Sequence, residues 1–484
     1  MSEVDAPKAA PGPSSSEIEA VVASVSKEAL SYIESLAERP LRSSEPERAL
    51  EAFAGPLPEE GAGAADTLER LFSDGVDAAV HSAGPRFFHF VIGGVTPAAL
   101  GAEWFGSVLD QNPGLWIASP LGARLELVSV AWLLDLFRLP SDWGGVLTTG
   151  ATMANFVSLA CARHWCGERA GLDVEQQGVR ALPEIRVLSS GYIHASSLKA
   201  CGMLGLGRDS VRKLTRDSAG RIDLDALEHE LDELDGAPSI VIANAGEVNA
   251  GDFDPIDDMA ALAQRYGAWL HVDGAFGLFA RATPETLDLC RGIEAANSVA
   301  ADGHKWLNVP YDSGFAFVSD RRLLQATFGI SAAYLTPGGE DRPDLGFMGP
   351  EMSRKARGLA VWATLNAYGR EGHRRMIERH LMLARRVGER VEAAPDLELL
   401  AEVKLNIVCF RLHPPGLSEQ ELDELNAQVG RAVLDDGRVF VGTTIYRGKV
   451  AFRPAIVNWR TTEADVDLMV DVLRELSNKA VSAL

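Results

Sequence analysis

The middle of the chain alternates short apolar runs with longer stretches that carry apolar residues at helical spacing. The runs span residues 145–147, 185–188, 239–243, 268–272, 298–301 and 314–318. Each has the length of a buried strand, and most intervals are long enough for a helix. This alternation is typical of an α/β domain built on a mostly parallel sheet.

Different patterns flank this region. On its N-terminal side, residues 18–36 and 68–80 carry apolar positions at helical spacing and predict a helical arm. On its C-terminal side, strands and helices in irregular order predict a smaller α+β domain. The strands are expected at residues 405–411, 439–443 and 449–454, and the helices at residues 418–434 and 463–476.

The chain therefore divides into four predicted parts. With 484 residues it is long enough for two domains and an arm. Residues 1–16 have the composition of a disordered tail. Residues 17–84 are assigned to the arm, residues 85–365 to the large domain and residues 366–484 to the small C-terminal domain.

Composition excludes several classes of protein. The formal net charge of −22 argues against nucleic acid, whose binding needs a basic face. The longest apolar stretch, residues 90–109, is interrupted by Pro97 and Glu103, so no membrane span is expected. Five cysteines without paired short spacings favour reduced thiols in the cytoplasm over a metal site. The first residues lack the basic and apolar segments of an export signal.

Two residues beyond strand ends suggest the chemistry. Lys305 comes four residues after the run at 298–301, and Asp273 directly follows the run at 268–272. A lysine in a cleft can form a Schiff base with pyridoxal 5′-phosphate (PLP), and a buried aspartate can keep the pyridine nitrogen protonated. An isolated aspartate more often caps a helix or a turn. Because Lys305 is placed next along the sheet, we prefer the cofactor role for Asp273.

Other strand ends add residues suited to the same cofactor. Residues 148–152 open a helix whose N-H groups suit a phosphate, although an ordinary threonine-capped helix fits the same pattern. His194 could lie flat on a conjugated ring, with Ala275 on the opposite face, although a lone histidine is usually structural. His304 can donate to phosphate; a solvent-exposed His-Lys pair is the alternative.

These motifs together resemble the group II PLP-dependent amino acid decarboxylases, which include the aromatic L-amino acid and glutamate decarboxylases. The resemblance rests on His194 and on residues 271–275 and 302–312, and it extends from about residue 85 to about residue 460. It implies a fold type I enzyme with a mostly parallel seven-stranded sheet. It also implies a homodimer with shared active sites, in which the arm wraps the partner subunit.

The resemblance implies roles for individual residues. Lys305 would form the Schiff base, Asp273 would contact the pyridine nitrogen, and His194 would stack on the ring. The remaining cofactor-binding positions are Ala151, Thr152 and His304 at the phosphate, and Asn249 and Ala275 at the ring. The substrate-binding positions are Phe90, Ile92, Tyr334, Phe347 and Met348, with Asn112 and Trp116 from the other subunit. Arg453 is a candidate for gripping the substrate carboxylate, although a structural salt bridge fits it equally.

One departure leaves the reaction open. Decarboxylases of this family usually carry a loop tyrosine that protonates the substrate carbanion, and residues 338–350 contain none. Relatives with phenylalanine there release an aldehyde instead. We expect decarboxylation of an amino acid. An aromatic side chain is weakly favoured by a group of aromatic residues that could equally be core residues, namely Phe87, Phe88, Phe90, Trp104 and Trp116. The alternatives are an aldehyde synthase, another carbon-bond cleavage, transamination, or a cofactor-binding scaffold without activity.

Overall fold

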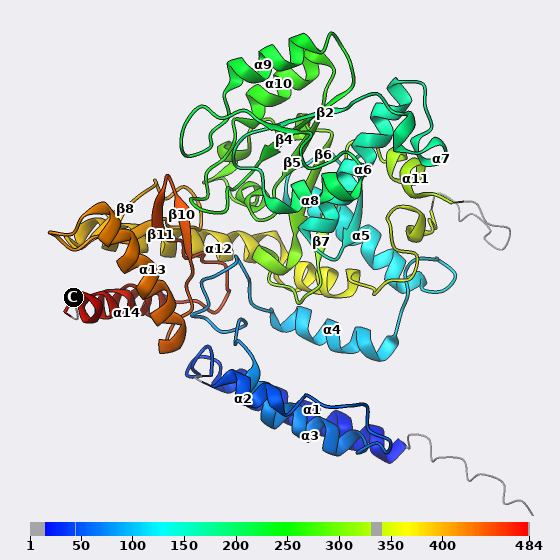
Figure 1. Ribbon diagram of the computed structural model, residues 1–484. Helices are drawn as coiled ribbons and strands as arrows, with labels where there is room; N and C mark the ends of the chain where they lie inside the picture. The colour runs from blue at the N-terminus through cyan, green and yellow to red at the C-terminus, as the bar shows by residue number, and fades with distance from the viewer. Residues whose placement is uncertain (1–14, 44, 331–340, 483–484) are drawn as a thin grey trace, which may run out of the picture.

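The largest part of the protein is built around a seven-stranded sheet (Figure 1). The computed structural model describes residues 15–43, 45–330 and 341–482. The strand order is β1-β7-β6-β5-β4-β2-β3, in which the five strands from β6 to β3 are parallel. The strands are β1 (Gly144–Thr148), β2 (Arg186–Ser189), β3 (Val211–Lys213), β4 (Ser239–Asn244), β5 (Trp269–Asp273), β6 (Ser298–Asp302) and β7 (Gly314–Val318). The predicted mostly parallel sheet is confirmed.

Strand β7 is antiparallel to both of its neighbours, β1 and β6. Strands β1 and β6 therefore run in the same direction, and their carboxyl ends meet at one edge with those of β5, β4 and β2. Short β3 has no counterpart among the apolar runs, because only one of its three residues is apolar and none is buried.

Helices cover both faces of this sheet, which is why its central strands are fully buried. Ile240 and Ile242 of β4 belong to one hydrophobic core, together with residues of α6 (Ala151–Arg169). Val241 and Ala243 belong to the other, with residues of α10 (Ile256–Tyr266). The remaining helices of this region are α4 (Pro97–Leu109), α5 (Pro120–Leu136), α7 (Val174–Gln177), α8 (Ala195–Met203), α9 (Leu224–Glu233) and α11 (Arg322–Phe328), with short helical turns at η1 (Val179–Ala181), η2 (Gly277–Ala282), η3 (Leu287–Cys290), η4 (Ile293–Ala295), η5 (Gly303–Leu307) and η6 (Leu345–Phe347).

A second, four-stranded antiparallel sheet has the order β10-β11-β9-β8. Its elements are β8 (Leu397–Leu399), β9 (Phe410–Leu412), β10 (Thr443–Tyr446), β11 (Lys449–Phe452), α13 (Glu419–Asp436) and α14 (Glu463–Val481). Both predicted helices are present, each opening on a capping box, at Ser418 and Thr462. Of the strand predicted at residues 405–411, only residues 410 and 411 belong to a strand, β9.

Long helix α12 (Gly358–Ala393) connects the two sheets. Its backbone leaves the helical conformation at Gly369, where φ is 59°. A positive φ is inexpensive only for glycine, so the break falls at the residue that tolerates it. The domain boundary expected between residues 365 and 366 falls inside this helix and stays a prediction.

Three N-terminal helices form a separate layer beneath the rest of the chain (Figure 1). They are α1 (Ser15–Ser35), α2 (Pro46–Glu51) and α3 (Ala64–Ala78). None of the three contains a buried residue, although apolar side chains recur along α1 and α3. Most of the range 1–16 lies outside the described residues, and its last two residues belong to α1. Among the described helices, none is long and apolar enough to cross a membrane.

Candidate active site

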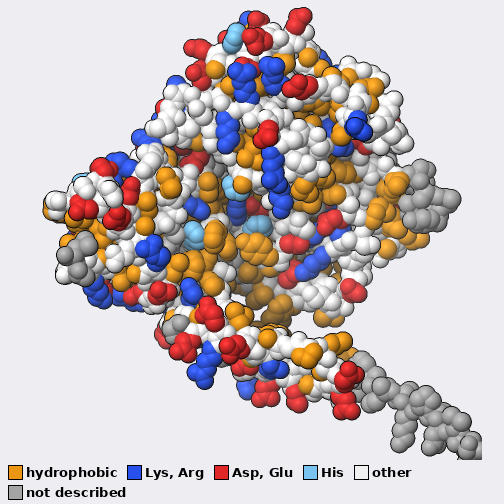
Figure 2. Space-filling model, in the orientation of Figure 1, with side chains coloured by type: hydrophobic (Ala, Val, Ile, Leu, Met, Phe, Trp, Pro, Cys, Tyr) orange, Lys and Arg blue, Asp and Glu red, His pale blue; other side chains and the backbone are white. Residues whose placement is uncertain are grey.

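A cavity of about 480 Å³ lies at the carboxyl edge of the large sheet. Figure 2 shows histidine and basic side chains around a hollow in the middle of this face. Side chains from the ends of β1, β2, β4, β5 and β6 line the cavity, as expected for ligand sites in sheets of this kind. The predicted residues that line it are Phe90, Ala151, Thr152, His194, Asp273, Ala275, His304, Lys305 and Arg453.

Asp273, the last residue of β5, is held by neutral donors. Its side chain is 5% exposed. Asn155 Nδ2 donates to Oδ2 at 2.8 Å and Ser197 Oγ donates to the same oxygen at 3.0 Å. The backbone N-H of Ala275 donates to Oδ1 at 3.2 Å. The carboxylate is thus fixed in position while its charge is left uncompensated.

A chain of hydrogen bonds behind Asp273 fixes the orientation of Asn155. Asn155 Oδ1 lies 2.9 Å from His271 Nε2, and His271 Nδ1 lies 2.9 Å from Ser298 Oγ. Trp269 Nε1 donates to the same hydroxyl at 3.0 Å. Every group is satisfied when His271 is neutral and carries its proton on Nε2. Burial lowers the pKa of His271, which favours this neutral form.

The turn between β1 and α6 presents the N-terminus of a helix to the cavity. Gly150 is the N-cap, and a Cβ on it would come within 3.1 Å of His304 Cε1 and 3.3 Å of Asp302 Oδ1. Only glycine leaves this approach free of crowding. The Ala151 N-H donates to Asp302 Oδ1 at 2.5 Å.

Lys305 lies in the helical turn η5, directly after β6. Its Nζ is 3.1 Å from Asp302 Oδ2 and 5.7 Å from the centre of the Phe276 ring. The side chain is 18% exposed. The amine therefore has one anionic neighbour, one aromatic neighbour and access to the cavity.

His304 precedes the lysine and is largely enclosed. Its ring stacks on Tyr311 with centroids 4.2 Å apart, and burial lowers its pKa. Its Nδ1 is buried without a hydrogen-bond partner among the described residues. A buried polar atom left in this way needs an explanation, and a ligand atom in the cavity would supply one.

His194 and Ala275 border the cavity from neighbouring strand ends. His194 is the N-cap of α8, and its Nδ1 accepts from the Ser196 N-H at 3.2 Å and lies 2.7 Å from Ser196 Oγ. The imidazole is exposed, with one nitrogen held by the helix it caps. Its orientation is thus set by the start of α8.

Arg453, just after β11, brings a cation from the small sheet into the cavity wall. Its Nη1 donates to Val248 O at 3.0 Å, and burial lowers its pKa. Asn249 is not part of the wall. It contacts the buried carboxylate of Glu247 and accepts from Thr444 Oγ1 at 2.6 Å.

The predicted substrate-binding positions are placed unevenly. Phe90 lines the cavity with 58% of its surface exposed, and it shares a left-handed backbone conformation with Val91. Ile92 is half-buried outside the wall, Phe347 is buried, and Met348 packs against the core of the α6 side. Tyr334 lies outside the described residues.

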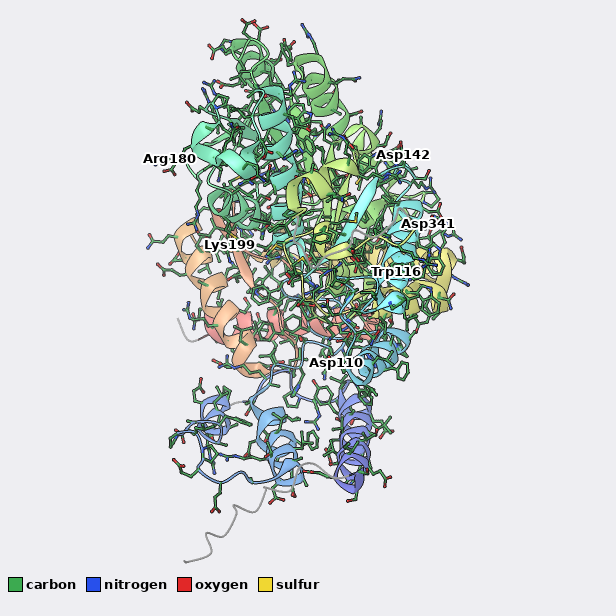
Figure 3. The ribbon with its side chains drawn as sticks, turned by 90° about the vertical axis from the view of Figure 1, so that its right-hand side faces the viewer. Asp110, Trp116, Asp142, Arg180, Lys199 and Asp341 are labelled. Atoms are coloured by element: carbon green, nitrogen blue, oxygen red, sulfur yellow. The ribbon has the colours of Figure 1, made fainter. Side chains whose placement is uncertain are left out.

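Asn112 and Trp116 do not line the cavity. Asn112 Oδ1 accepts from the Arg354 N-H at 3.1 Å, and the Trp116 N-H donates to Asp344 Oδ1 at 2.8 Å. In Figure 3, Asp110 lies at the lower edge of the main body next to the arm, and Trp116 lies above it. That Asn112 and Trp116 complete the site of another subunit remains a prediction.

Three polar residues at the centre of the site were not among the site residues predicted from the sequence. Asn155 and Ser197 hold Asp273, and Asp302 contacts Lys305 and Ala151. Asn155 lies one helical turn beyond Ala151, so it faces the same side of α6. Asp302 lies three residues before Lys305, within the motif at residues 302–312. Their spacing from Ala151 and Lys305 could therefore have identified Asn155 and Asp302 as candidate site residues.

The residues present fit PLP. An accessible lysine amine, a buried carboxylate without a cation, and a helix N-terminus beside an unpaired histidine nitrogen surround one cavity. These groups match the aldehyde, the pyridine nitrogen and the phosphate of the cofactor. The fold and the site together define a fold type I PLP enzyme.

Comparisons with known proteins identify the family. Residues 56–413 match the pyridoxal-dependent decarboxylase conserved domain. The chain is 29% identical to an aromatic-L-amino-acid decarboxylase of Bacillus atrophaeus over 85% of each chain, and 30% identical to an L-2,4-diaminobutyrate decarboxylase of Rhizobium meliloti over 88% of this chain and 84% of that one. The crystal structure of Oryza sativa TDC with PLP and tryptamine matches with a TM-score of 0.89 and 23% identity, covering 97% of this chain and 99% of that one, which shows the shared fold.

The chain belongs to the group II PLP-dependent decarboxylases. It is a PLP-dependent amino acid decarboxylase, a carboxy-lyase whose cofactor is pyridoxal 5′-phosphate. The relatives named above act on side chains of different chemistry. Family membership therefore establishes the reaction class and leaves the substrate to the site.

Proposed function

We propose that the protein decarboxylates an L-amino acid with an aromatic side chain, releasing the amine and carbon dioxide. The observation that carries this proposal is Phe90, whose ring is 58% exposed and borders the cavity beside Val91 and Phe276. An exposed aromatic ring in a cavity wall gains free energy when an apolar side chain covers it.

The site residues divide the work between them. Lys305 holds the cofactor through its amine, Asp273 keeps a proton on the pyridine nitrogen, and His194 contacts the ring. Ala151, Thr152 and His304 bind the phosphate, and Ala275 lines the ring. When bound, PLP accepts the electron pair left on the substrate as carbon dioxide departs. The uncompensated charge of Asp273 supports this assignment, because it favours a cation at the adjacent position.

Arg453 binds the α-carboxylate of the substrate in this scheme. Its guanidinium is buried in the cavity wall, and a bond to Val248 O leaves other N-H groups for a ligand. A charge-assisted pair in a partly buried site is worth more than a surface pair. Arg453→Lys would keep the charge and lose the planar fork, so KM for all substrates should rise more than kcat falls.

Substrate choice is tested with the holoenzyme and a panel of L-amino acids. Phenylalanine, tyrosine and tryptophan should give higher kcat/KM than diaminobutyrate, glutamate or cysteine sulfinate, with carbon dioxide and amine released in equal amounts. Phe90→Ala should lower kcat/KM for aromatic substrates about tenfold or more, since burying such a side chain is worth about 1.5–3 kcal/mol. Exposed Phe53→Ala in the arm is the matched control. Preference for an acidic or basic substrate would overturn the proposal.

The second candidate is oxidative deamination. Residues 338–350 contain no tyrosine, and the part of this segment that the structure describes contributes no side chain to the cavity wall. In that reaction the amino acid, dioxygen and water give an aldehyde, carbon dioxide, ammonia and hydrogen peroxide. Peroxide and aldehyde formed in step with carbon dioxide would establish it, whereas amine without oxygen uptake establishes decarboxylation alone.

We also propose that the protein works as a homodimer with shared sites. Apolar side chains are exposed along α4 and the loop after it: Trp104 by 41%, Phe105 by 58%, Val108 by 76% and Ile117 by 88%. Exposed large apolar side chains that gather in one region favour association with another protein surface. Asn112 and Trp116 lie in the same loop region, where a partner's site would need them. The arm wraps the partner, and the four-part division of the chain accompanies this arrangement.

Mixing two inactive variants tests the shared site. Lys305→Ala lacks the cofactor anchor, and a variant with Asn112 and Trp116 replaced by alanine lacks the residues supplied in trans. A mixture refolded together should recover about a quarter of the native activity, because half of the dimers are hybrids with one intact site. No recovery, or a monomer in sedimentation, would contradict shared sites.

A further inference from the structure

Asp302 is the residue at the centre of the site that the proposed mechanism does not use. It ends β6 and is 3% exposed. Its Oδ1 accepts from the Ala151 N-H at 2.5 Å, and its Oδ2 lies 3.1 Å from Lys305 Nζ. One carboxylate thus bridges the N-terminus of α6 and the lysine.

Both partners of Asp302 are groups that the cofactor needs. The Ala151 N-H is one of the proposed phosphate donors, and the Lys305 amine is the proposed anchor. A helix N-terminus attracts an anion, and Asp302 already supplies one. A phosphate that takes the Ala151 N-H must therefore displace a carboxylate of the same sign.

The surroundings give Asp302 few other partners. The described cations closest to its carboxylate are Lys305 and, when protonated, His304, whose Nε2 is 3.5 Å from Oδ1. Burial lowers the pKa of His304 and so favours its neutral form. The charge of Asp302 is therefore balanced mainly by Lys305, and forming the Schiff base would change that balance.

We propose that Asp302 is a resident anion that competes with the cofactor's phosphate for the N-terminus of α6, and that it thereby restrains cofactor binding while stabilising the cofactor-free chain. The proposal rests on the proposed position of the phosphate at Ala151 and Thr152. Asp302 acts here as a positioning residue for the phosphate site and for Lys305, and it sets how readily the enzyme loads.

Binding of two vitamers to the cofactor-free protein isolates the phosphate. Pyridoxamine 5′-phosphate lacks the aldehyde and binds without a covalent bond, and pyridoxamine lacks the phosphate as well. The ratio of their dissociation constants, measured by fluorescence titration, is the preference for the phosphate. In Asp302→Asn this preference should rise about tenfold, the order of effect that one close charge has in a partly screened site. The melting temperature of the cofactor-free variant should fall, because Lys305 loses its counter-ion.

Two comparisons make the result decisive. Asp320→Asn also removes one negative charge, just after β7, but Asp320 pairs with Arg322 and is 45% exposed, so the preference should stay unchanged. A purely structural role of Asp302 would lower the melting temperature without raising the preference. An unchanged or reduced preference in Asp302→Asn would overturn the proposal. Should that variant not fold, Asp302→Ser gives the same comparison.

Ala151→Pro separates this proposal from the placement of the phosphate on which it rests. Proline removes the Ala151 N-H and is tolerated at the first position of a helix, after an extended residue such as Gly150. If the phosphate binds there, the preference should fall in this variant. A fall here with no change in Asp302→Asn would refute only the role of Asp302. An unchanged preference in Ala151→Pro would refute the placement and the role together.

Discussion

The two buried carboxylates of the site, Asp273 and Asp302, end neighbouring parallel strands but are balanced in opposite ways. Their exposures are similar, 5% and 3%. Neutral donors surround Asp273, namely Asn155, Ser197 and a backbone N-H. Asp302 instead lies 3.1 Å from a cation, Lys305. Within the described residues, Asp273 forms no ion pair with an Arg or Lys side chain.

This difference separates two ways of accommodating a charge in a protein interior. Dipoles from neutral donors stabilise the Asp273 carboxylate without cancelling its charge, so it can still act on a ligand cation. The cation beside Asp302 offsets its charge, and in the proposed mechanism the same amine anchors the cofactor. If both proposals hold, the end of the site at Asp273 is organised before the cofactor binds, and the end at Asp302 rearranges when it does.

The largest expected effect comes from removing the amine. Lys305→Ala should lower kcat by several orders of magnitude, because the variant loses the covalent anchor. The visible absorbance band of the Schiff base should disappear from the purified protein. Circular dichroism should show an unchanged fold. If the variant kept both the band and the activity, Lys305 would not be the cofactor anchor, and the comparison of the two carboxylates would lose its basis.

The next effect tests the uncompensated carboxylate. Asp273→Asn preserves shape and removes the charge, so kcat should fall about 10²–10³-fold, the size of effect seen when one electrostatic contact to the transition state is lost. Cofactor affinity should fall as well, opposite in sign to the rise expected for Asp302→Asn. If both variants change affinity in the same direction, the two carboxylates do not differ as described.

A smaller effect is expected from the support behind Asp273. Asn155→Ala removes a donor from Asp273 and an acceptor from His271, leaving buried groups unsatisfied at a cost of about 1–3 kcal/mol in unfolding free energy. Activity should fall with stability. The matched control is Asn426→Ala, which removes a buried amide bonded to Leu412 in the small sheet. The control should lose stability and keep kcat.

The smallest effect is on acid stability. Burial lowers the pKa of His271 from 6.5 to about 4. Below pH 6.5 the unfolded chain binds a proton that the folded chain does not, so this group's contribution is present at neutral pH and is lost as the pH falls from about 6.5 toward 4. Urea unfolding at several pH values should give a shallower acid slope for His271→Asn. Other buried histidines, such as His373, remain in both proteins.

Much of the fold could be read from patterns along the chain. Buried strands on both faces of a sheet are continuous apolar runs, and these located β1, β2 and β4 to β7. Strand β3 was not predicted, because its residues are mostly exposed and do not form an apolar run. Helix α2 was not predicted, because six residues are too few to show a clear helical period. The resemblance supplied the strand count.

The site residues also fall into those that the sequence could identify and those that it could not. Lys305, Asp273, His194 and His304 are chemically distinctive and follow strand ends, so order along the chain was enough to single them out, and the cavity brings them together. Asn249 was assigned to the ring, whereas the structure places it beside Glu247 and Thr444. Its role at the ring stays a prediction, because no periodicity fixes the path of the loop after β4.

The sequence by itself determined the α/β class and the strand ends, and it singled out Lys305 and Asp273 as candidates for the cofactor site, because these depend on local burial and on residue type. Only the tertiary structure decided how each carboxylate is balanced. Asn155 reaches Asp273 across 118 positions of the chain, and Asp302 reaches Ala151 across 151. Such contacts form where separate strands and helices pack, and hydrogen bonds across that distance leave no period in the sequence.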